Sequence, residues 1–166
     1  MKLNLTSEIV LNKVPVEIYS PKTAVDRSEI TRCEKIPTDI FPKIEDGAKS
    51  IADAIENEIK TKQREGKFCV LGLGTGLSLS PVYEELIHRH KVKKLSFHNV
   101  VVFNAYEYFQ LSKDTRNSAI NQLRERFLNH IDINPQNIFT PDGSVAQDKV
   151  QEHCRLYEQR IESFGG

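Results

Sequence analysis

The alternation of short apolar runs with amphipathic segments is the feature that most restricts how this chain folds. Residues 67–73 (KFCVLGL) and 100–104 (VVVFN) are apolar runs of the kind found in strands buried on both faces of a parallel sheet. Segments with the periodicity of amphipathic helices precede, separate and follow these two runs. Strands that alternate with helices predict an α/β fold with a mostly parallel sheet, right-handed crossovers and helices on both faces.

Four segments have the spacing of apolar residues that predicts a helix. They cover residues 44–65, 80–90, 118–131 and 147–164. The first should end at Gly66, because glycine readily adopts the left-handed conformation that follows a helix. The second begins at Ser80-Pro81, where the serine can cap the helix and the proline fits its first turn. In the third, Arg124 and Arg126 lie opposite the apolar face, so we expect both to be solvated.

Composition divides the chain into two regions. Residues 1–34 are mixed and polar, with one strand-like stretch at 14–19 (VPVEIY), and we interpret them as an N-terminal extension. Residues 35–166 contain the periodic segments and form the predicted domain, which is three-layered and Rossmann-like. The chain stops just after its last predicted helix, where an alternating fold would continue with a strand. We therefore expect a truncated piece of a longer protein, with a natural terminus as the alternative.

The charge balance limits the classes of partner that this chain could bind, and its cysteines indicate the cellular compartment. Lys and Arg number 23 and Asp and Glu number 23, so the chain has no overall basic field for nucleic acid or an anionic membrane. No apolar stretch approaches the length of a membrane span. Cys33, Cys69 and Cys154 are widely spaced and form no CxxC pair, which favours a reducing, cytoplasmic location. The histidines show no metal-ligand spacing, so we expect no metal.

A glycine-rich turn, Gly74-Thr75-Gly76, follows the first predicted strand and leads into a helix. Converging backbone N–H groups and the positive end of a helix favour an anion at such a turn, and phosphate is the usual one. Ser78 and Ser80 add hydroxyl groups near that of Thr75. The alternative is that the glycines only make a tight connection between strand and helix.

The residues of this turn argue against two common nucleotide sites. The turn lacks the Lys-Ser/Thr pair that closes a P-loop. It also departs from the dinucleotide pattern GxGxxG, because Leu77 occupies the place of the third glycine. Glu107 loosely imitates the acid that binds a ribose, so a nucleotide-binding oxidoreductase domain stays open as the weakest alternative. A small phosphorylated metabolite is the better expectation.

Four blocks of sequence occur in the order found in one enzyme family. They are VLGLGTGLSLSPVYEELI (70–87), LSFHNVVVFNAYEYFQL (95–111), FLNHIDINPQNIFTPDG (127–143) and CRLYEQRIESFGG (154–166). On these blocks the chain resembles the glucosamine-6-phosphate deaminase/isomerase family over residues 35–166. The resemblance implies that the loop after the first strand holds the phosphate of a sugar phosphate. The matching positions here are Gly74, Thr75, Gly76, Leu77 and Ser78.

The resemblance also implies a reaction without metal or organic cofactor: ring opening, proton transfer through an enediol, and loss of ammonia from C2. The family pattern has its aspartate base at the position of Tyr106, in the run FNAYEY (103–108). A phenol is a poor base near neutral pH, since its ordinary pKa is about 10. Glu107 is the adjacent acid, but neighbouring residues of a strand point to opposite faces. It replaces the aspartate only if the chain leaves the strand before it.

The second catalytic group of the family is missing from this chain. In the family a histidine that assists ring opening lies in a later segment, beyond residue 166. We therefore expect residues 1–166 alone to have little or no turnover as a glucosamine-6-phosphate deaminase. A non-catalytic domain that binds or senses a sugar phosphate is the alternative. The implied partner is a small sugar phosphate, and a homo-oligomer remains open.

Overall fold

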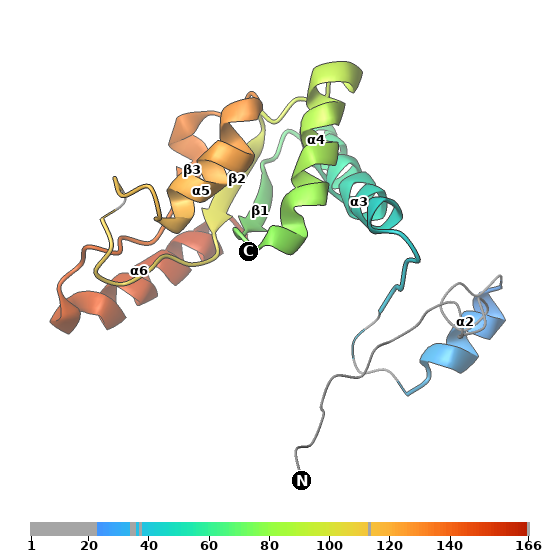
Figure 1. The fold of residues 1–166 in the computed structure, drawn as a ribbon, viewed down its shortest axis with the longest axis horizontal. Helices are drawn as coiled ribbons and strands as arrows, with labels where there is room; N and C mark the ends of the chain where they lie inside the picture. Colours follow the sequence, from blue (N-terminus) through green and yellow to red (C-terminus); the bar gives the residue numbers. More distant parts are fainter. Residues whose placement is uncertain (1–22, 34–35, 37, 113, 166) are drawn as a thin grey trace, which may run out of the picture. The chain divides into compact units, whose positions relative to one another are not determined.

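The computed structural model is described over most of the 166-residue chain (Figure 1). The described residues are 23–33, 36, 38–112 and 114–165. They fall into two compact units, Met1–Gly47 and Ala48–Gly166, and each unit is considered by itself. The strand predicted at residues 14–19 lies outside the described residues.

The first unit contains helix α2 (Ala24–Thr31), which lies within the predicted N-terminal extension. Thr23 caps this helix by accepting a hydrogen bond from the backbone N–H of Asp26 at 3.1 Å. An ion pair joins Arg27 to Asp39 at 2.6 Å, with both side chains more than half exposed. Such surface pairs stabilise a fold by at most about 1 kcal/mol.

Helix α3 (Ile44–Arg64) forms where the apolar spacing predicts it. Ala48, Ala52 and Ile59 are buried along one face of this helix. Its first turn is acidic and its last turn is basic, which complements the helix dipole. The chain leaves the helix just before Gly66, whose φ of 67° confirms the predicted glycine stop.

Three parallel strands form the sheet in the order β1-β2-β3 (Figure 1). Two of them were predicted, β1 (Cys69–Leu73) and β2 (Val100–Asn104), and they pair along their whole length. The third strand, β3 (Ile138–Phe139), was not predicted, because two residues are too few to show a pattern. It pairs with the middle of β2, with Phe139 opposite Phe103.

Helices cover both faces of the sheet, as the alternating pattern predicts. On one face, Val100 and Val102 of β2 belong to a continuous apolar core. This core also contains buried side chains of α3, of α4 (Ser80–Lys93) and of α5 (Ala119–Arg126). The helix predicted at 118–131 is shorter than expected. α5 ends at Arg126, and a separate 3₁₀ turn, Leu128–His130, follows it.

The opposite face of the sheet packs against α6 (Val150–Ser163) through aromatic side chains. Phe103 stacks on Phe139 with ring centroids 5.0 Å apart. Tyr157 and Phe164, from α6 and its end, meet the Phe103 ring edge-on at 5.7 and 5.8 Å. The Tyr157 hydroxyl also donates to the Phe139 carbonyl at 3.2 Å, which ties α6 to the sheet.

Strand β1 is less buried than its apolar sequence suggests. Phe68, which precedes it, is 51% exposed, and Gly72 is exposed within it. Among the described residues no strand pairs with the outer edge of β1. The expected burial on both faces is therefore confirmed for β2, whose residues are all buried, and wrong for β1.

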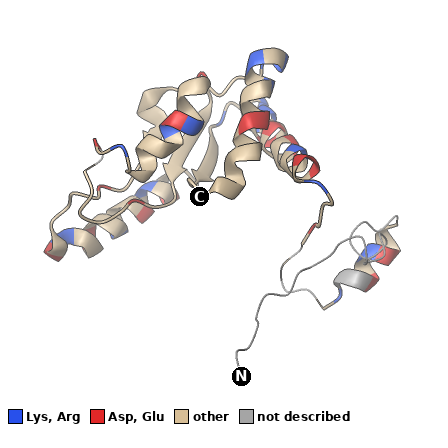
Figure 2. Cartoon of the chain, in the orientation of Figure 1, with Lys and Arg blue, Asp and Glu red and all other residues tan. Residues whose placement is uncertain are grey.

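Charged residues lie on helices and loops, and none lies in the three strands (Figure 2). A charged network centred on a buried arginine joins α3 and α4. Arg89 of α4, with 3% of its side chain exposed, pairs with Asp53 at 2.6 Å, Glu56 at 2.9 Å and Glu85 at 2.8 Å. The described helices include none that is both long and apolar enough to cross a bilayer.

Candidate functional site

The glycine turn lies at the carboxyl end of β1, where parallel α/β sheets bind ligands. The chain passes from Gly74-Thr75-Gly76 into a 3₁₀ turn, Leu77–Leu79, and only then into α4. The expected cap by Ser80 is wrong: Ser80 already lies inside α4, and the capping position is Leu79, which makes no side-chain cap. The 3₁₀ turn displaces the start of the helix, because it extends the helical backbone toward the glycines.

The carbonyl groups of the turn are fixed by side chains from two helices. The Tyr83 hydroxyl of α4 donates to the Gly74 carbonyl at 2.5 Å. Burial raises the pKa of Tyr83 to about 12, so this hydroxyl keeps its proton. Arg126, in the last turn of α5, donates from Nη1 to the Thr75 carbonyl at 2.5 Å. Within the described part of the chain, the backbone N–H groups of Thr75 and Gly76 have no hydrogen-bond partner.

The two residues that hold these carbonyls were not expected at the site. The prediction that Arg126 is solvated is wrong, since it is only partly exposed and reaches across to the turn. Arg124 does remain exposed, with a hydrogen bond to the Asn121 side chain at 3.3 Å. The spacing of apolar residues shows only which side of α5 is buried against its own core, so it gives no signal for the reach of a long arginine.

Tyr106 meets the glycine turn directly. It follows β2 by two residues, and its hydroxyl is hydrogen-bonded to Oγ1 of Thr75. The buried Asn104 side chain donates to the Tyr106 carbonyl at 2.8 Å, which fixes the backbone there. The Tyr106 ring packs edge-on against Tyr108 with centroids 5.7 Å apart and is 39% exposed. The structure thus brings together Thr75 and the residue at the position of the expected base.

The Glu107 carboxylate binds backbone N–H groups and not the glycine turn. β2 ends at Asn104, so the chain has left the strand before Glu107. However, the Glu107 carboxylate accepts hydrogen bonds from the backbone N–H groups of Tyr108 at 3.0 Å, Ala119 at 2.8 Å and Ile120 at 3.1 Å. Two of these donors belong to the first turn of α5, so Glu107 caps that helix together with its N-cap residue, Ser118. Both carboxylate oxygens of Glu107 therefore accept backbone hydrogen bonds at the start of α5.

Gly143 anchors the loop that follows Tyr106. The backbone N–H of Gln110 donates to the Gly143 carbonyl at 2.7 Å. A Cβ atom at Gly143 would lie 2.3 Å from the Tyr108 carbonyl oxygen and 2.5 Å from that of Leu111. Only glycine permits this approach, so Gly143 sets the path of the loop that contains Tyr106 and Glu107.

Three residues of the turn have simpler surroundings. Leu77 is 77% exposed, and its side chain therefore adds no buried contact to the turn. Gly76 has room for a Cβ atom, with the Ser78 hydroxyl 3.5 Å away. Ser78 lies in the 3₁₀ turn beside Gly76, where its exposed hydroxyl faces the turn.

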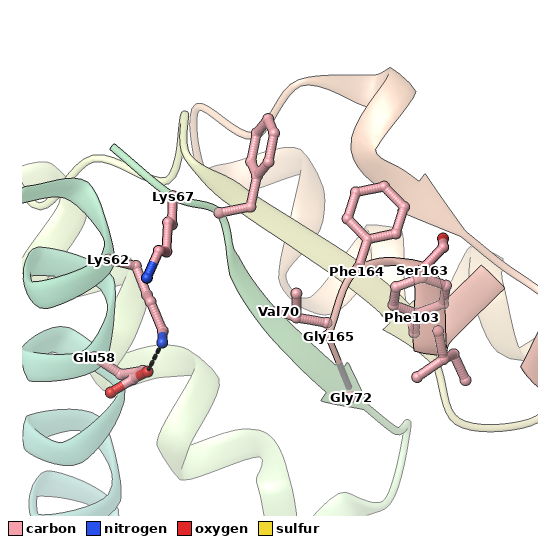
Figure 3. Close-up of a pocket in the computed structure, with 11 residues that line it drawn as sticks. Glu58, Lys62, Lys67, Val70, Gly72, Phe103, Ser163, Phe164 and Gly165 are labelled. Carbon is pink, nitrogen blue, oxygen red and sulfur yellow. Dashed lines mark ion pairs between the residues drawn. The ribbon is translucent and has the colours of Figure 1, made fainter. Parts of the chain in front are cut away.

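A pocket of about 860 Å³ lies on the Phe103 face of the sheet, between α3, β1 and the end of α6 (Figure 3). Phe103 and Phe164 form one side of it, and Lys62, which pairs with Glu58 at 3.4 Å, lies on the other. None of residues 74–78 lines it. Its aromatic wall lies on the open face of β1. The two lysines in its lining, Lys62 and Lys67, are paired with Glu58 and Glu65.

No metal centre accompanies the turn. The described residues include no group of three or more His, Cys, Asp or Glu side chains that could hold a metal ion. The polar groups that the structure places at the turn are backbone N–H groups, hydroxyl groups and the Arg126 guanidinium.

Comparison with known proteins gives a consistent family. A family model described as glucosamine-6-phosphate isomerases/6-phosphogluconolactonase matches residues 42–166. A glucosamine-6-phosphate deaminase-like protein of Bacteroides thetaiotaomicron is 55% identical over 166 residues, which are 100% of this chain and 25% of that protein. A glucosamine-6-phosphate deaminase of Treponema denticola is 45% identical over 122 residues, covering 73% of this chain and 44% of that enzyme.

Solved structures agree with the sequence matches. A monomeric glucosamine-6-phosphate deaminase superposes with a TM-score of 0.69 and 35% identity, over 75% of this chain and 49% of that chain. A protein described as devB, 17% identical with a TM-score of 0.58, shares the fold. The predicted α/β fold with a parallel sheet is confirmed. The chain spans about half or less of the length of these relatives.

Proposed function

Because the chain belongs to the glucosamine-6-phosphate isomerase/6-phosphogluconolactonase family, we propose that its glycine turn binds the phosphate of an amino-sugar phosphate. Three features support this proposal. The turn lies at the carboxyl end of a parallel strand, and two of its N–H groups have no partner among the described residues. The hydroxyl groups of Thr75 and Ser78 and the Arg126 guanidinium lie beside them.

The reaction that the family name suggests is the isomerisation and deamination of glucosamine 6-phosphate. We propose that residues 1–166 alone perform this reaction slowly or not at all. The single observation behind this proposal is the hydrogen bond between the Tyr106 hydroxyl and Thr75, at the position where a base is needed. The Glu107 carboxylate does not replace the base, since it caps α5. Loss of a positioned base typically lowers a rate by about 10²–10⁴-fold.

Two measurements on the 166-residue chain test this function. Titration calorimetry should detect glucosamine 6-phosphate and fructose 6-phosphate, and should detect glucosamine at least about tenfold more weakly, because the phosphate makes the charged contacts. An assay for ammonia release from glucosamine 6-phosphate should give no rate above background. Ordinary deaminase rates would contradict the proposed inactivity, and equal affinity for glucosamine would contradict the phosphate site.

A second candidate is a non-catalytic domain that binds or senses a sugar phosphate. Tyr106 favours it, because a phenol fixed on the phosphate turn contributes to binding without serving as a ready base. The substitution Tyr106→Asp in the full-length protein separates the two candidates. A gain of ammonia release would favour an enzyme that lost its base, and unchanged inactivity with retained binding would favour the binding domain.

The cysteines support a cytoplasmic location for this protein. Cys33, Cys69 and Cys154 are all free, and Cys33 and Cys154 are exposed. Exposed free thiols persist in a reducing compartment, where disulfides are rare.

A further inference from the structure

Arg126 links α5 to the glycine turn over a separation of 51 residues in the chain. Its Nη1 donates to the carbonyl of Thr75, a residue that is only 6% exposed. An arginine has five N–H donors in a planar fork, and this bond uses one of them. The partly exposed guanidinium therefore has further donors at the edge of the turn.

The charge of Arg126 is not balanced by the protein. Among the described residues no carboxylate forms an ion pair with it, whereas Arg89 has three carboxylate partners. The turn itself, residues 74–78, contains no charged side chain. Glu107, the acid closest in sequence to Tyr106, has both carboxylate oxygens bound at the start of α5. The site thus holds one cation next to unpartnered backbone N–H groups, which is the complement of an anion.

We propose that Arg126 is a ligand-positioning residue, which orders the glycine turn through the Thr75 carbonyl and supplies positive charge to the bound phosphate. This inference rests on the proposed phosphate site and adds a residue from outside the turn to it. The Thr75 carbonyl and the Gly76 N–H belong to one trans peptide and point in opposite directions. The guanidinium therefore acts on the phosphate across this peptide, by polarising its N–H and by its own positive charge. Holding the Thr75 carbonyl also fixes the direction of the Gly76 N–H, which stays available to the ligand.

The test compares the affinity of the 166-residue chain for glucosamine 6-phosphate in the parent, Arg126→Gln, Arg126→Lys and Arg124→Gln. Arg124 is the matched control, because it is an exposed arginine of the same helix whose described bond goes to Asn121. We expect Arg126→Gln to weaken binding by about 10- to 100-fold, and Arg126→Lys by less than about 5-fold. Arg124→Gln should change the affinity by less than about 2-fold.

A salt series separates the charge from a purely structural effect. Loss of the positive charge should make the affinity for glucosamine 6-phosphate less sensitive to salt in Arg126→Gln than in the parent, while the weak affinity for glucosamine stays the same. An unchanged salt dependence, or equal weakening for both sugars, would overturn the role in charge. Should Arg126→Gln fail to fold, a tenfold or greater loss in folded Arg126→Lys would overturn it as well.

The same binding measurements distinguish an error about Arg126 from an error about the phosphate site itself. If the parent chain binds no sugar phosphate, the phosphate site is wrong and Arg126 has no ligand to position. If the parent binds glucosamine 6-phosphate and Arg126→Gln binds it equally well, the site stands and only the role of Arg126 is overturned.

Discussion

The Tyr106 hydroxyl is hydrogen-bonded to the Thr75 hydroxyl, so the residue at the position of the expected base touches the predicted phosphate turn. The bond connects the loop after β2 to the turn after β1. Thr75 is 6% exposed, whereas Tyr106 is 39% exposed. The phenol therefore lies over the turn on its solvent side.

Replacement of Tyr106 by phenylalanine should remove this bond and leave the buried Thr75 hydroxyl without it. We expect the free energy of unfolding to fall by about 1 kcal/mol, the usual net value of a hydrogen bond. Urea denaturation measures the change. Tyr108→Phe is the control, because the Tyr108 hydroxyl has no hydrogen bond within the described part of the chain. Equal effects of the two substitutions would show that the Tyr106 bond contributes nothing specific.

Replacement of Glu107 by alanine should destabilise α5, because its backbone N–H groups at Ala119 and Ile120 lose their carboxylate acceptor. A lost helix cap typically costs about 1–2 kcal/mol, measured by urea denaturation. Glu125→Ala on the exposed side of α5 is the control and should stay within about 0.5 kcal/mol. A loss of glucosamine 6-phosphate affinity with unchanged stability would contradict the capping role.

Replacement of Gly143 by alanine should disturb the loop that contains Tyr106. The new Cβ atom would lie 2.3 Å from the Tyr108 carbonyl oxygen, and backbone has to move. We expect destabilisation of about 1–3 kcal/mol by urea or thermal unfolding. At Gly72 nothing lies within 4 Å of an added Cβ atom, so Gly72→Ala should be neutral or slightly stabilising. If both alanines behave alike, the close approach at Gly143 is not a constraint.

Replacement of Arg89 by methionine should leave three carboxylates without their shared cation. The Arg89 side chain is 3% exposed, and Glu56 and Glu85 are 14% and 19% exposed. Removing the cation should cost about 3 kcal/mol, because Glu56 and Glu85 stay largely desolvated, whereas Asp53 is 66% exposed and loses little. Arg64→Met is the control on the exposed end of α3, with an expected change below about 0.5 kcal/mol. A small loss at Arg89 would mean that water already screens the network.

The lowered pKa of Asp132 should make the stability of the fold depend on pH in acid. Burial works against its charge, but hydrogen bonds from the Ser96 hydroxyl at 2.5 Å and the Phe97 N–H at 2.6 Å, with His90 nearby, hold its pKa below the ordinary value. A lowered folded pKa means that ionised Asp132 stabilises the fold above its unfolded pKa of about 3.9. This contribution is lost as the pH falls through the folded value.

We therefore expect Asp132→Asn to flatten the acid side of the stability profile. The urea midpoint, measured between pH 3 and pH 7, should differ most from the parent above about pH 4 and converge with it below. Asp148→Asn, at an exposed position with no hydrogen bond or ion pair among the described residues, should follow the parent profile. Parallel profiles for parent and Asp132→Asn would contradict a lowered pKa in the folded state.

Local patterns predicted much of this fold correctly. The apolar face of α3 and its stop at Gly66, the strand β2 and the parallel arrangement all follow from periodicities of a few residues. Such patterns are local because helix and strand each repeat their side-chain directions over two to four residues. The two-residue strand β3 was missed for the same reason, since it is shorter than one readable repeat.

The sequence by itself determined the longer helices, the strands β1 and β2 and the glycine turn between β1 and α4, because backbone preferences and side-chain periodicity act between near neighbours. Only the tertiary structure decided that Arg126 reaches Thr75, that Tyr106 covers the turn and that Glu107 caps α5. Each of these contacts depends on how the sheet brings distant loops to one edge and on the direction of a long side chain. Neither the relative position of distant loops nor the direction of a side chain can be read from the spacing of residues along the chain.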